Sequence, residues 1–229
     1  MIVGNGMLAN AFREAGYGAA LDVIFASGVS NSQCTNTALF ERERALLEKT
    51  LLAAAADSRV VYFGTCSVQD PAQQHSPYVA HKLNMESLAL SHPRGIVFRL
   101  PQVAGPNAPG NTLLTVLCNS IRSNEPITAW RNASRNIVDL ADVVQVISFL
   151  LRSGAAVPKI VNVANPRSSS VAEIIASAEK ALNASALVIW VSEGASYEID
   201  VSYVQPVFDS LGIDFDYEYL VRVIRRYYL

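Results

Sequence analysis

The sequence predicts an α/β protein in which a parallel sheet is covered by helices on both faces. Short apolar runs alternate with longer amphipathic segments along most of the 229 residues, and this alternation is typical of β-α-β units. Hydrophobic residues make up 51% of the chain, which is enough to bury a large core. A stretch rich in proline and glycine follows residue 100 and predicts the start of a second, smaller lobe.

The first half of the chain contains four predicted strands and three predicted helices. The strands are the short apolar runs at 1–3, 22–27, 59–65 and 95–100. Apolar residues at helical spacing predict helices over 7–15, 38–56 and 78–91. Parallel strands bring the loops that follow them to one edge of the sheet, where open α/β folds bind ligands.

The second half has a more mixed pattern. It predicts a helix over 112–124, a strand entering a helix over 134–154, a strand over 159–165, a serine-capped helix over 168–183, a strand over 186–192 and a final helix near 216–228. We assign residues 1–101, with a returning segment at about 137–163, to the sheet domain. Residues 102–136 and 164–229 then form a small discontinuous C-terminal lobe.

Composition excludes several classes of function. The formal net charge is −2, which predicts no nucleic-acid partner and no anionic membrane surface. No apolar run approaches the roughly 20 residues that span a bilayer, and the N-terminus lacks the pattern of a signal peptide. Three scattered cysteines predict neither a disulfide framework nor a metal site. We therefore expect a cytoplasmic protein.

A glycine-containing turn follows the first predicted strand. The sequence "GNGMLA" places Gly4 and Gly6 at the first two glycines of a G-x-G-x-x-G/A pattern, with Ala9 at the third position. Such a turn lets a pyrophosphate approach the backbone closely, and the following helix supplies amide donors. The pattern predicts a dinucleotide site, although a plain strand–turn–helix has the same appearance.

A tyrosine and a lysine lie one helical turn apart in "YVAHK". Tyr78 and Lys82 share one helix face, and an ammonium near a phenol stabilises the phenolate, so the tyrosine can exchange protons with a carbonyl or alcohol oxygen. Thr65 and Ser67 follow the third predicted strand and are the candidate hydroxyls that would orient the same oxygen.

Other chemically suggestive residues have simpler interpretations. Cys66 has no histidine tied to it by the sequence, so we expect a buried or passive thiol. His81 lies between Tyr78 and Lys82 but on a different helix face, which predicts a solvated histidine. The run "ERER" at 41–44 is typical of a solvated helix face.

Taken together, these motifs resemble the extended short-chain dehydrogenases/reductases that act as NAD(P)-dependent sugar-nucleotide epimerases, dehydratases and reductases. The matching pieces run in family order along most of the chain: "GNGMLA", "VIFASG", "YFGTCSV", "YVAHK", "FRLPQVAGPN", "SRNIVDLADVV" and "VNVANPRSSSVAEII". Within the family the chain is most similar to the reductases, dTDP-4-dehydrorhamnose reductase among them. The resemblance implies a Rossmann-like sheet that binds the cofactor and a second lobe that binds the substrate.

The resemblance also implies roles for individual residues. Thr65 would hold the reacting oxygen, Tyr78 would be the general acid/base, and Lys82 would lower the pKa of Tyr78 and grip the nicotinamide ribose. NAD or NADP would lie along Gly4, Gly6, Met7, Leu8, Ala26, Ser27, Gly28, Lys82, Pro101 and Val103. A nucleotide-sugar substrate would meet Gln102, at the place of an asparagine in relatives, and Arg135.

The chain departs from this family between residues 9 and 23. Relatives place a second and a third strand there, and the second ends in a residue that binds the adenosine ribose. Here only one helix and "GYGAALD" fill the interval, so the sheet is shortened and the choice between NAD and NADP stays open. The helix after residue 37 also lacks an asparagine of the relatives, with Phe40 or Glu41 near its position.

Two hypotheses therefore stand. In the first, the chain is an oxidoreductase or epimerase of nucleotide-linked sugars, most simply a reductase of a keto-sugar in polysaccharide biosynthesis, with a site that a homodimer partner would complete. Cys66 stands where dehydratases carry an acid, which counts against dehydration. In the second, it is a catalytically degenerate nucleotide-binding or regulatory protein.

Overall fold

A five-stranded parallel sheet forms the centre of the computed structural model, which describes residues 1–17, 22–108 and 110–229. The strands follow one another in chain order across the sheet, and every neighbouring pair is parallel. They are β1 (Ile2–Val3), β2 (Val23–Phe25), β3 (Val60–Thr65), β4 (Gly95–Leu100) and β9 (Ile160–Asn162). The predicted Rossmann-like α/β class is therefore confirmed.

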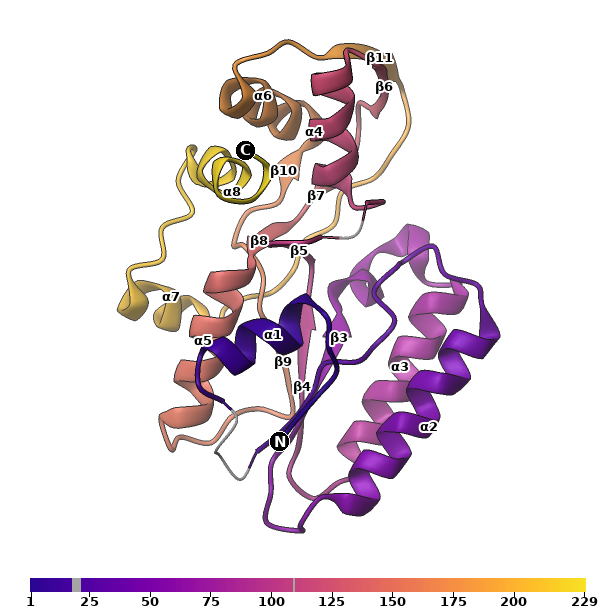
Figure 1. Ribbon diagram of the computed structural model, residues 1–229, viewed down its shortest axis with the longest axis vertical. Coiled ribbons are helices and arrows are strands. Elements are labelled where there is room, and N and C mark those ends of the chain that lie inside the picture. Colours follow the sequence, from indigo (N-terminus) through magenta and orange to yellow (C-terminus); the bar gives the residue numbers. More distant parts are fainter. Residues whose placement is uncertain (18–21, 109) are drawn as a thin grey trace.

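Helices cover both faces of the sheet (Figure 1). On one face lie α2 (Thr37–Ala53) and α3 (Pro77–Leu90), and on the other lie α1 (Met7–Glu14) and α5 (Leu140–Arg152). Side chains of successive strand residues point to opposite faces, so Tyr62 packs with the α2–α3 side, while Val61 and Phe63 pack with the α1–α5 side.

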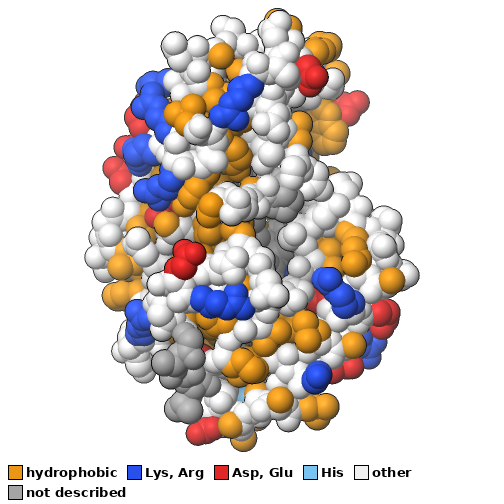
Figure 2. All heavy atoms as spheres, in the orientation of Figure 1, with side chains coloured by type: hydrophobic (Ala, Val, Ile, Leu, Met, Phe, Trp, Pro, Cys, Tyr) orange, Lys and Arg blue, Asp and Glu red, His pale blue; other side chains and the backbone are white. Residues whose placement is uncertain are grey.

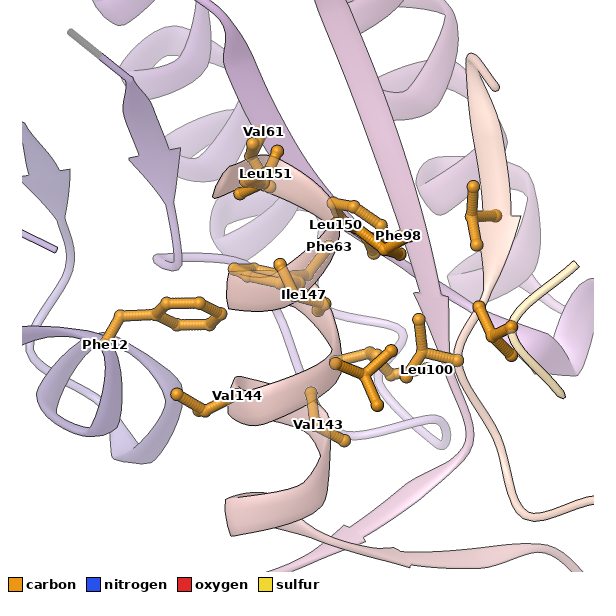
Figure 3. Close-up of a cluster of buried hydrophobic side chains, with 14 of the residues drawn as sticks. Phe12, Val61, Phe63, Phe98, Leu100, Val143, Val144, Ile147, Leu150 and Leu151 are labelled. Atoms are coloured by element: carbon orange, nitrogen blue, oxygen red, sulfur yellow. The ribbon is translucent and has the colours of Figure 1, made fainter. Parts of the chain in front are cut away.

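The main hydrophobic core lies between α5 and the sheet (Figure 3). The buried face of α5 presents Val143, Val144, Ile147, Leu150 and Leu151 to the side chains of β3 and β4, which are buried on both faces of the sheet. Phe12 reaches the same core from α1 and contacts the Phe63 ring, with centroids 5.6 Å apart. This core holds the strands whose ends carry the candidate site.

A second lobe is built around three helices: α4 (Leu113–Ser123), α6 (Val171–Leu182) and α8 (Tyr219–Tyr228). Its outer edge is a parallel pair, β6 (Pro126–Trp130) with β11 (Leu187–Val191). Two further pairs lie where the lobes meet: β5 (Gln102–Ala104) with β8 (Ile137–Asp139), and β7 (Ser134–Arg135) with β10 (Ser169–Ser170). The lobe lies above the sheet in Figure 1.

The segment between β11 and α8 connects both lobes. It contains α7 (Gln205–Leu211), whose Val207 and Phe208 belong to the core of the sheet domain. The division of the chain into domains at residues 101, 137 and 163 remains a prediction, and α7 is a C-terminal element that packs on the sheet side.

Most predicted elements are present within one to three residues of their expected bounds. The serine cap of α6 is Ser170, which forms a capping box with Glu173. The sequence did not indicate β5, β6, α7 or the two-residue strands β7 and β10, nor the short 3₁₀ turns at Cys66–Gln69 and Pro71–Gln73. These elements are short and partly exposed, so they lack a clear periodic pattern.

The β1 edge of the sheet is where the relatives of this family would have their additional second and third strands. Among the described residues no strand pairs with the outer side of β1, as the short link in the sequence predicts. Residues 18–21 of that link lie outside the described residues. Across the described ranges, no helix has the length and apolar character needed to cross a bilayer.

Asp139 fastens the C-terminal helix to the start of α5. Its carboxylate caps α5 through the amide of Ala141 at 2.8 Å, and it also accepts hydrogen bonds from Arg226 at 2.8 Å and from the Tyr227 hydroxyl at 2.6 Å. The Tyr219 hydroxyl accepts a hydrogen bond from the Asp139 amide and donates one to the Asp142 carboxylate. One buried carboxylate therefore joins α5 to residues of α8 that lie 87 and 88 positions further along the chain.

Replacing Asp139 by alanine should weaken both attachments. We expect a loss of about 2–4 kcal/mol in the free energy of unfolding, because a helix cap and buried hydrogen bonds of a charged group disappear together. Urea unfolding measures the loss, and Asp57→Asn, at an exposed turn, is the control. Equal stability of the two variants would contradict the anchoring role.

Candidate functional site

The candidate site lies at the carboxyl edge of the parallel sheet, where four loops converge. Gly4–Gly6 follows β1, Ala26–Gly28 follows β2, Thr65 ends β3, and Pro101 follows β4. Because the four strands are parallel neighbours, these segments lie side by side. In Figure 2 the surface narrows to a waist between the sheet domain and the second lobe.

The glycine turn after β1 is closely packed at one glycine and open at the other. Gly4 has a φ of +119°, and a Cβ there would overlap the carbonyl oxygen of Ala26 at the end of β2. A Cβ at Gly6 would meet no atom within 4 Å. The turn therefore has free space at Gly6, beside the first amides of α1.

Polar and apolar side chains support the same turn. The Arg13 guanidinium donates hydrogen bonds to the Gly4 carbonyl and, at 2.8 Å, to Asn10 Oδ1. The side chains of Met7 and Leu8 pack against the main core, and the Met7 sulfur lies close to Gly105, just after β5. Met7 and Leu8 therefore contribute their backbone, and not their side chains, to the glycine turn.

The two glycines should respond differently to alanine. Gly4→Ala should lower the free energy of unfolding by more than about 2 kcal/mol, because it combines a left-handed backbone with a clash against backbone atoms. Gly6→Ala should cost less than about 1 kcal/mol, since its φ of −78° is ordinary and its surroundings are open. Urea unfolding of both variants checks this, and similar losses would contradict the packing described.

Thr65 and Tyr78 meet at the end of β3. Tyr78 is the second residue of α3, whose N-cap is Ser76 and whose first residue is Pro77. Its side chain is 5% exposed and Thr65 is 6% exposed. Burial raises the pKa of Tyr78 to about 12, and a side-chain hydrogen bond with Thr65 opposes that rise. The phenol therefore keeps its proton at neutral pH.

The structure corrects the expected effect of Lys82 on Tyr78. After burial and Thr65, the charge of Glu43 is the next influence on the pKa of Tyr78, which it raises, and Lys82 is not among the strongest influences. Lys82 is instead paired with Glu43, whose Oε1 lies 3.3 Å from the Lys82 Nζ. An ammonium with an adjacent carboxylate has little net charge to offer a phenolate.

Glu43 is the centre of a buried polar cluster. Its side chain has no exposed surface, and its two oxygens accept from four groups on three neighbouring segments. Oε2 accepts from the Val29 amide at 2.6 Å and lies 2.9 Å from His81 Nε2. Oε1 accepts from the Tyr62 hydroxyl at 2.6 Å and from Lys82 at 3.3 Å.

Two sequence-based interpretations were wrong at this cluster. Within the run at 41–44 three residues are exposed as predicted, but Glu43 is buried. His81 is not solvated: it is 8% exposed, bonded to Glu43 and stacked on the Phe40 ring with centroids 4.3 Å apart. A signal was present, because Glu43 precedes the buried Leu47 by four residues and shares its helix face.

The surroundings of Glu43 favour its ionised form. Burial raises the pKa of this carboxyl, but hydrogen bonds from His81, Tyr62 and Val29 and the charge of Lys82 outweigh burial and lower it to about 2. A pKa below the unfolded value contributes stability that is present above pH 4.5 and is lost as the pH falls toward 2.

Glu43→Gln should therefore remove the contribution of this carboxyl group to the pH dependence of the unfolding free energy. In the parent protein about 3 kcal/mol of unfolding free energy should disappear between pH 5 and pH 2 through this group. The stability gap between parent and Glu43→Gln should shrink over the same range, as urea unfolding at several pH values would show. Glu48→Gln, on the exposed face of α2, is the control, and a gap independent of pH would contradict this role.

Gly28 separates the Glu43–Lys82 pair from the surface. It is exposed, and a Cβ there would lie 2.9 Å from Glu43 Oε1 and 3.0 Å from Lys82 Nζ. Both side chains are fixed by other contacts, so this position accommodates only glycine without displacing them. Ala26 and Ser27 are half-buried in the same loop.

Ser67 faces a different partner from Thr65. It lies close to the Tyr197 phenol, whose pKa burial raises to about 12 while the charge of Arg135 and the Ser67 hydroxyl oppose that rise. Tyr197 lies in the C-terminal segment, and no sequence motif indicated it. Cys66, between the two hydroxyls, is fully buried, and burial raises the pKa of its thiol to about 12. The predicted burial of this cysteine is confirmed.

The remaining predicted residues line the junction of the lobes. Pro101 and Val103 are half-buried and Gln102 is exposed, with Val103 packed against the main core. Arg135 lies on β7, with its guanidinium donating to the Ser134 carbonyl at 2.7 Å. Its charge lowers the pKa of Tyr197.

A family model and several solved structures match the chain. The model described as NAD dependent epimerase/dehydratase family matches residues 6–164, more than half of the chain. MoeE5 in complex with UDP-glucose and NAD is 19% identical, with a TM-score of 0.74 over 96% of this chain and 94% of that one. RMD from Pseudomonas aeruginosa complexed with NADPH is 15% identical, with a TM-score of 0.73 over 98% of both chains.

An epimerase gives a similar result. UDP-glucuronic acid 4-epimerase from Bacillus cereus, in complex with UDP-glucuronic acid and NAD, is 17% identical, with a TM-score of 0.69 over 96% of this chain and 79% of that one. At such identities the likeness shows a common fold. No curated protein matches the chain.

Proposed function

Since the chain belongs to the NAD-dependent epimerase/dehydratase family, we propose that it binds NAD or NADP and reduces a keto-sugar linked to a nucleotide. One observation carries the proposal: the Tyr78 phenol is buried beside Thr65 at the carboxyl edge of the sheet and keeps its proton. A protonated phenol donates to a carbonyl oxygen, which is the proton transfer that a reduction requires.

The residues present fit a dinucleotide at the phosphate-binding turn. Gly6 leaves open space beside the first amides of α1, where a pyrophosphate finds donors and the positive end of the helix dipole. Ala26, Ser27 and Gly28 would follow the cofactor at the next strand end, with Pro101 and Val103 beside the nicotinamide. Among the described residues the sheet ends at β1, so the adenosine half would rest on fewer protein groups.

The chain's own residues would act on the carbonyl group as follows. When bound, the reduced nicotinamide supplies a hydride. Thr65 would hold the carbonyl oxygen through its hydroxyl, and Tyr78 would donate its proton to that oxygen as the alcohol forms. The thiol of Cys66 is buried and protonated, so it offers no acid or base for a dehydration.

The substrate class is supported by the structural neighbours and by the second lobe. MoeE5 and the Bacillus cereus epimerase are described with UDP-linked sugars. In this chain Gln102 and Arg135 lie where the lobes meet, and a guanidinium suits a diphosphate. We also propose a role in polysaccharide biosynthesis, for which such a substrate is suited. The proposed homodimer is tested by light scattering.

Gly6→Ala should separate cofactor binding from folding. It should keep the thermal unfolding midpoint within a few degrees but weaken NADPH or NADH binding about tenfold or more, because a methyl group would occupy the space beside the amides. Quenching or enhancement of nicotinamide fluorescence measures the affinity. Unchanged affinity would contradict a pyrophosphate at this turn.

Tyr78→Phe tests the reaction itself. Cofactor affinity should stay within about threefold, while turnover of a 4-keto sugar nucleotide should fall at least about 100-fold, the usual contribution of a general acid. Stopped assays of NAD(P)H oxidation measure the rate, with Tyr203→Phe, a partly exposed tyrosine distant in sequence from the site, as the matched control.

A non-catalytic nucleotide-binding or regulatory protein is the second candidate. It is favoured by the Glu43–Lys82 pair and by a sheet that ends at β1 in the described residues. This hypothesis predicts that the protein binds a nucleotide sugar but does not convert it with either NADH or NADPH. Oxidation of NADH or NADPH that depends on Tyr78 would exclude it.

A further inference from the structure

Lys82 is unusually confined for a residue expected to contact a cofactor. Its side chain is 3% exposed, and its Nζ lies 3.3 Å from Glu43 Oε1 and 4.4 Å above the centroid of the Tyr62 ring. Gly28 lies beside it, since a Cβ added there would be 3.0 Å from the Lys82 Nζ. A buried ammonium without a counterion is strongly disfavoured, so the position of the Glu43 carboxylate fixes the position of the charged Lys82 side chain.

The carboxylate is itself held in place by groups other than Lys82. The Val29 amide and the Tyr62 hydroxyl donate to its two different oxygens, both at 2.6 Å, and His81 lies against Oε2. These contacts come from the loop after β2, from β3 and from α3, so rotation of the carboxylate would break several at once. Lys82 therefore binds to a preformed partner.

The other charged groups near Lys82 do not replace this partner. Glu86, one turn further along α3, accepts hydrogen bonds at both of its oxygens from Arg99 on β4, the shortest at 2.6 Å. Tyr62 and Tyr78 are buried phenols whose pKa values are raised by burial. The His81 Nε2 lies 2.9 Å from Glu43 Oε2.

We propose that Glu43 is a positioning residue that fixes the Lys82 ammonium against Gly28 and keeps it protonated for the cofactor site. The part that concerns the cofactor rests on the function proposed above, and the part that concerns Lys82 does not. Burial lowers the pKa of Lys82, and the charge and hydrogen bond of Glu43 are the main effects that oppose this lowering.

The charge state of Lys82 gives a direct test without any cofactor. In protein labelled with ¹⁵N and ¹³C at lysine, the Lys82 signal is assigned by its loss in Lys82→Met. Glu43→Gln should move the Lys82 titration to lower pH by at least about one unit, a tenfold change in proton affinity. Glu41→Gln, on the exposed face of the same helix, should leave it unchanged, and an unshifted titration in Glu43→Gln overturns the proposal.

Stability measured in two backgrounds covers the case in which Glu43→Gln folds poorly. With Lys82 present, Glu43→Gln should lower the thermal midpoint by roughly 10 °C, because it leaves a buried charge without a partner. In the Lys82→Met background the same change should cost much less. An equal cost in both backgrounds, or failure of both forms to fold, assigns Glu43 an architectural role and overturns the proposal.

Cofactor affinity tests the link to the site. From pH 6 to pH 9 the affinity of Glu43→Gln for NADPH should fall about tenfold more than that of Glu41→Gln, since Lys82 loses its proton earlier. If neither protein binds NADPH or NADH while the Lys82 titration shifts, the proposed function fails and the charge pairing stands. Parallel affinity profiles in the presence of binding overturn the cofactor part of the inference.

Discussion

A single buried carboxylate joins the elements that form the candidate site. Glu43 has no exposed surface, and a charge in such a place must be matched by donors on every side. It is matched by the amide of Val29, the hydroxyl of Tyr62 and the side chains of His81 and Lys82. The loop after β2, the strand β3 and the helices α2 and α3 can therefore adopt few arrangements relative to one another.

The candidate site was predictable where local spacing carries the chemistry. Tyr78 and Lys82 lie one turn apart on a helix, and the hydroxyl of Thr65 ends the neighbouring strand. The sequence could not show which charge Lys82 faces, because Glu43 lies within a run of charged residues and its partners come from segments 14 to 39 positions away. Pairing across helices depends on tertiary packing, which the local periodicity of the sequence does not reveal.

The fold was predictable to a similar degree. The alternation of apolar runs and helical stripes indicates the parallel sheet and its covering layers, since both patterns are long and periodic. Short pairs such as β7 with β10 contain two residues each, which is too few for any pattern. Nor does composition reveal that α7 returns to the sheet domain, because Val207 and Phe208 would suit either core.

The attachment of α8 has a consequence for synthesis on the ribosome. The helix packs against α4 and α6 and bonds to Asp139, all of which leave the exit tunnel earlier. Until residues 219–228 emerge, the apolar faces of those helices lack their cover and Asp139 lacks two of its donors. The sheet domain can fold first. The second lobe cannot complete its core until α8 is synthesised, more than 75 residues after Asp139. During that interval its apolar helix faces are exposed and available to a chaperone.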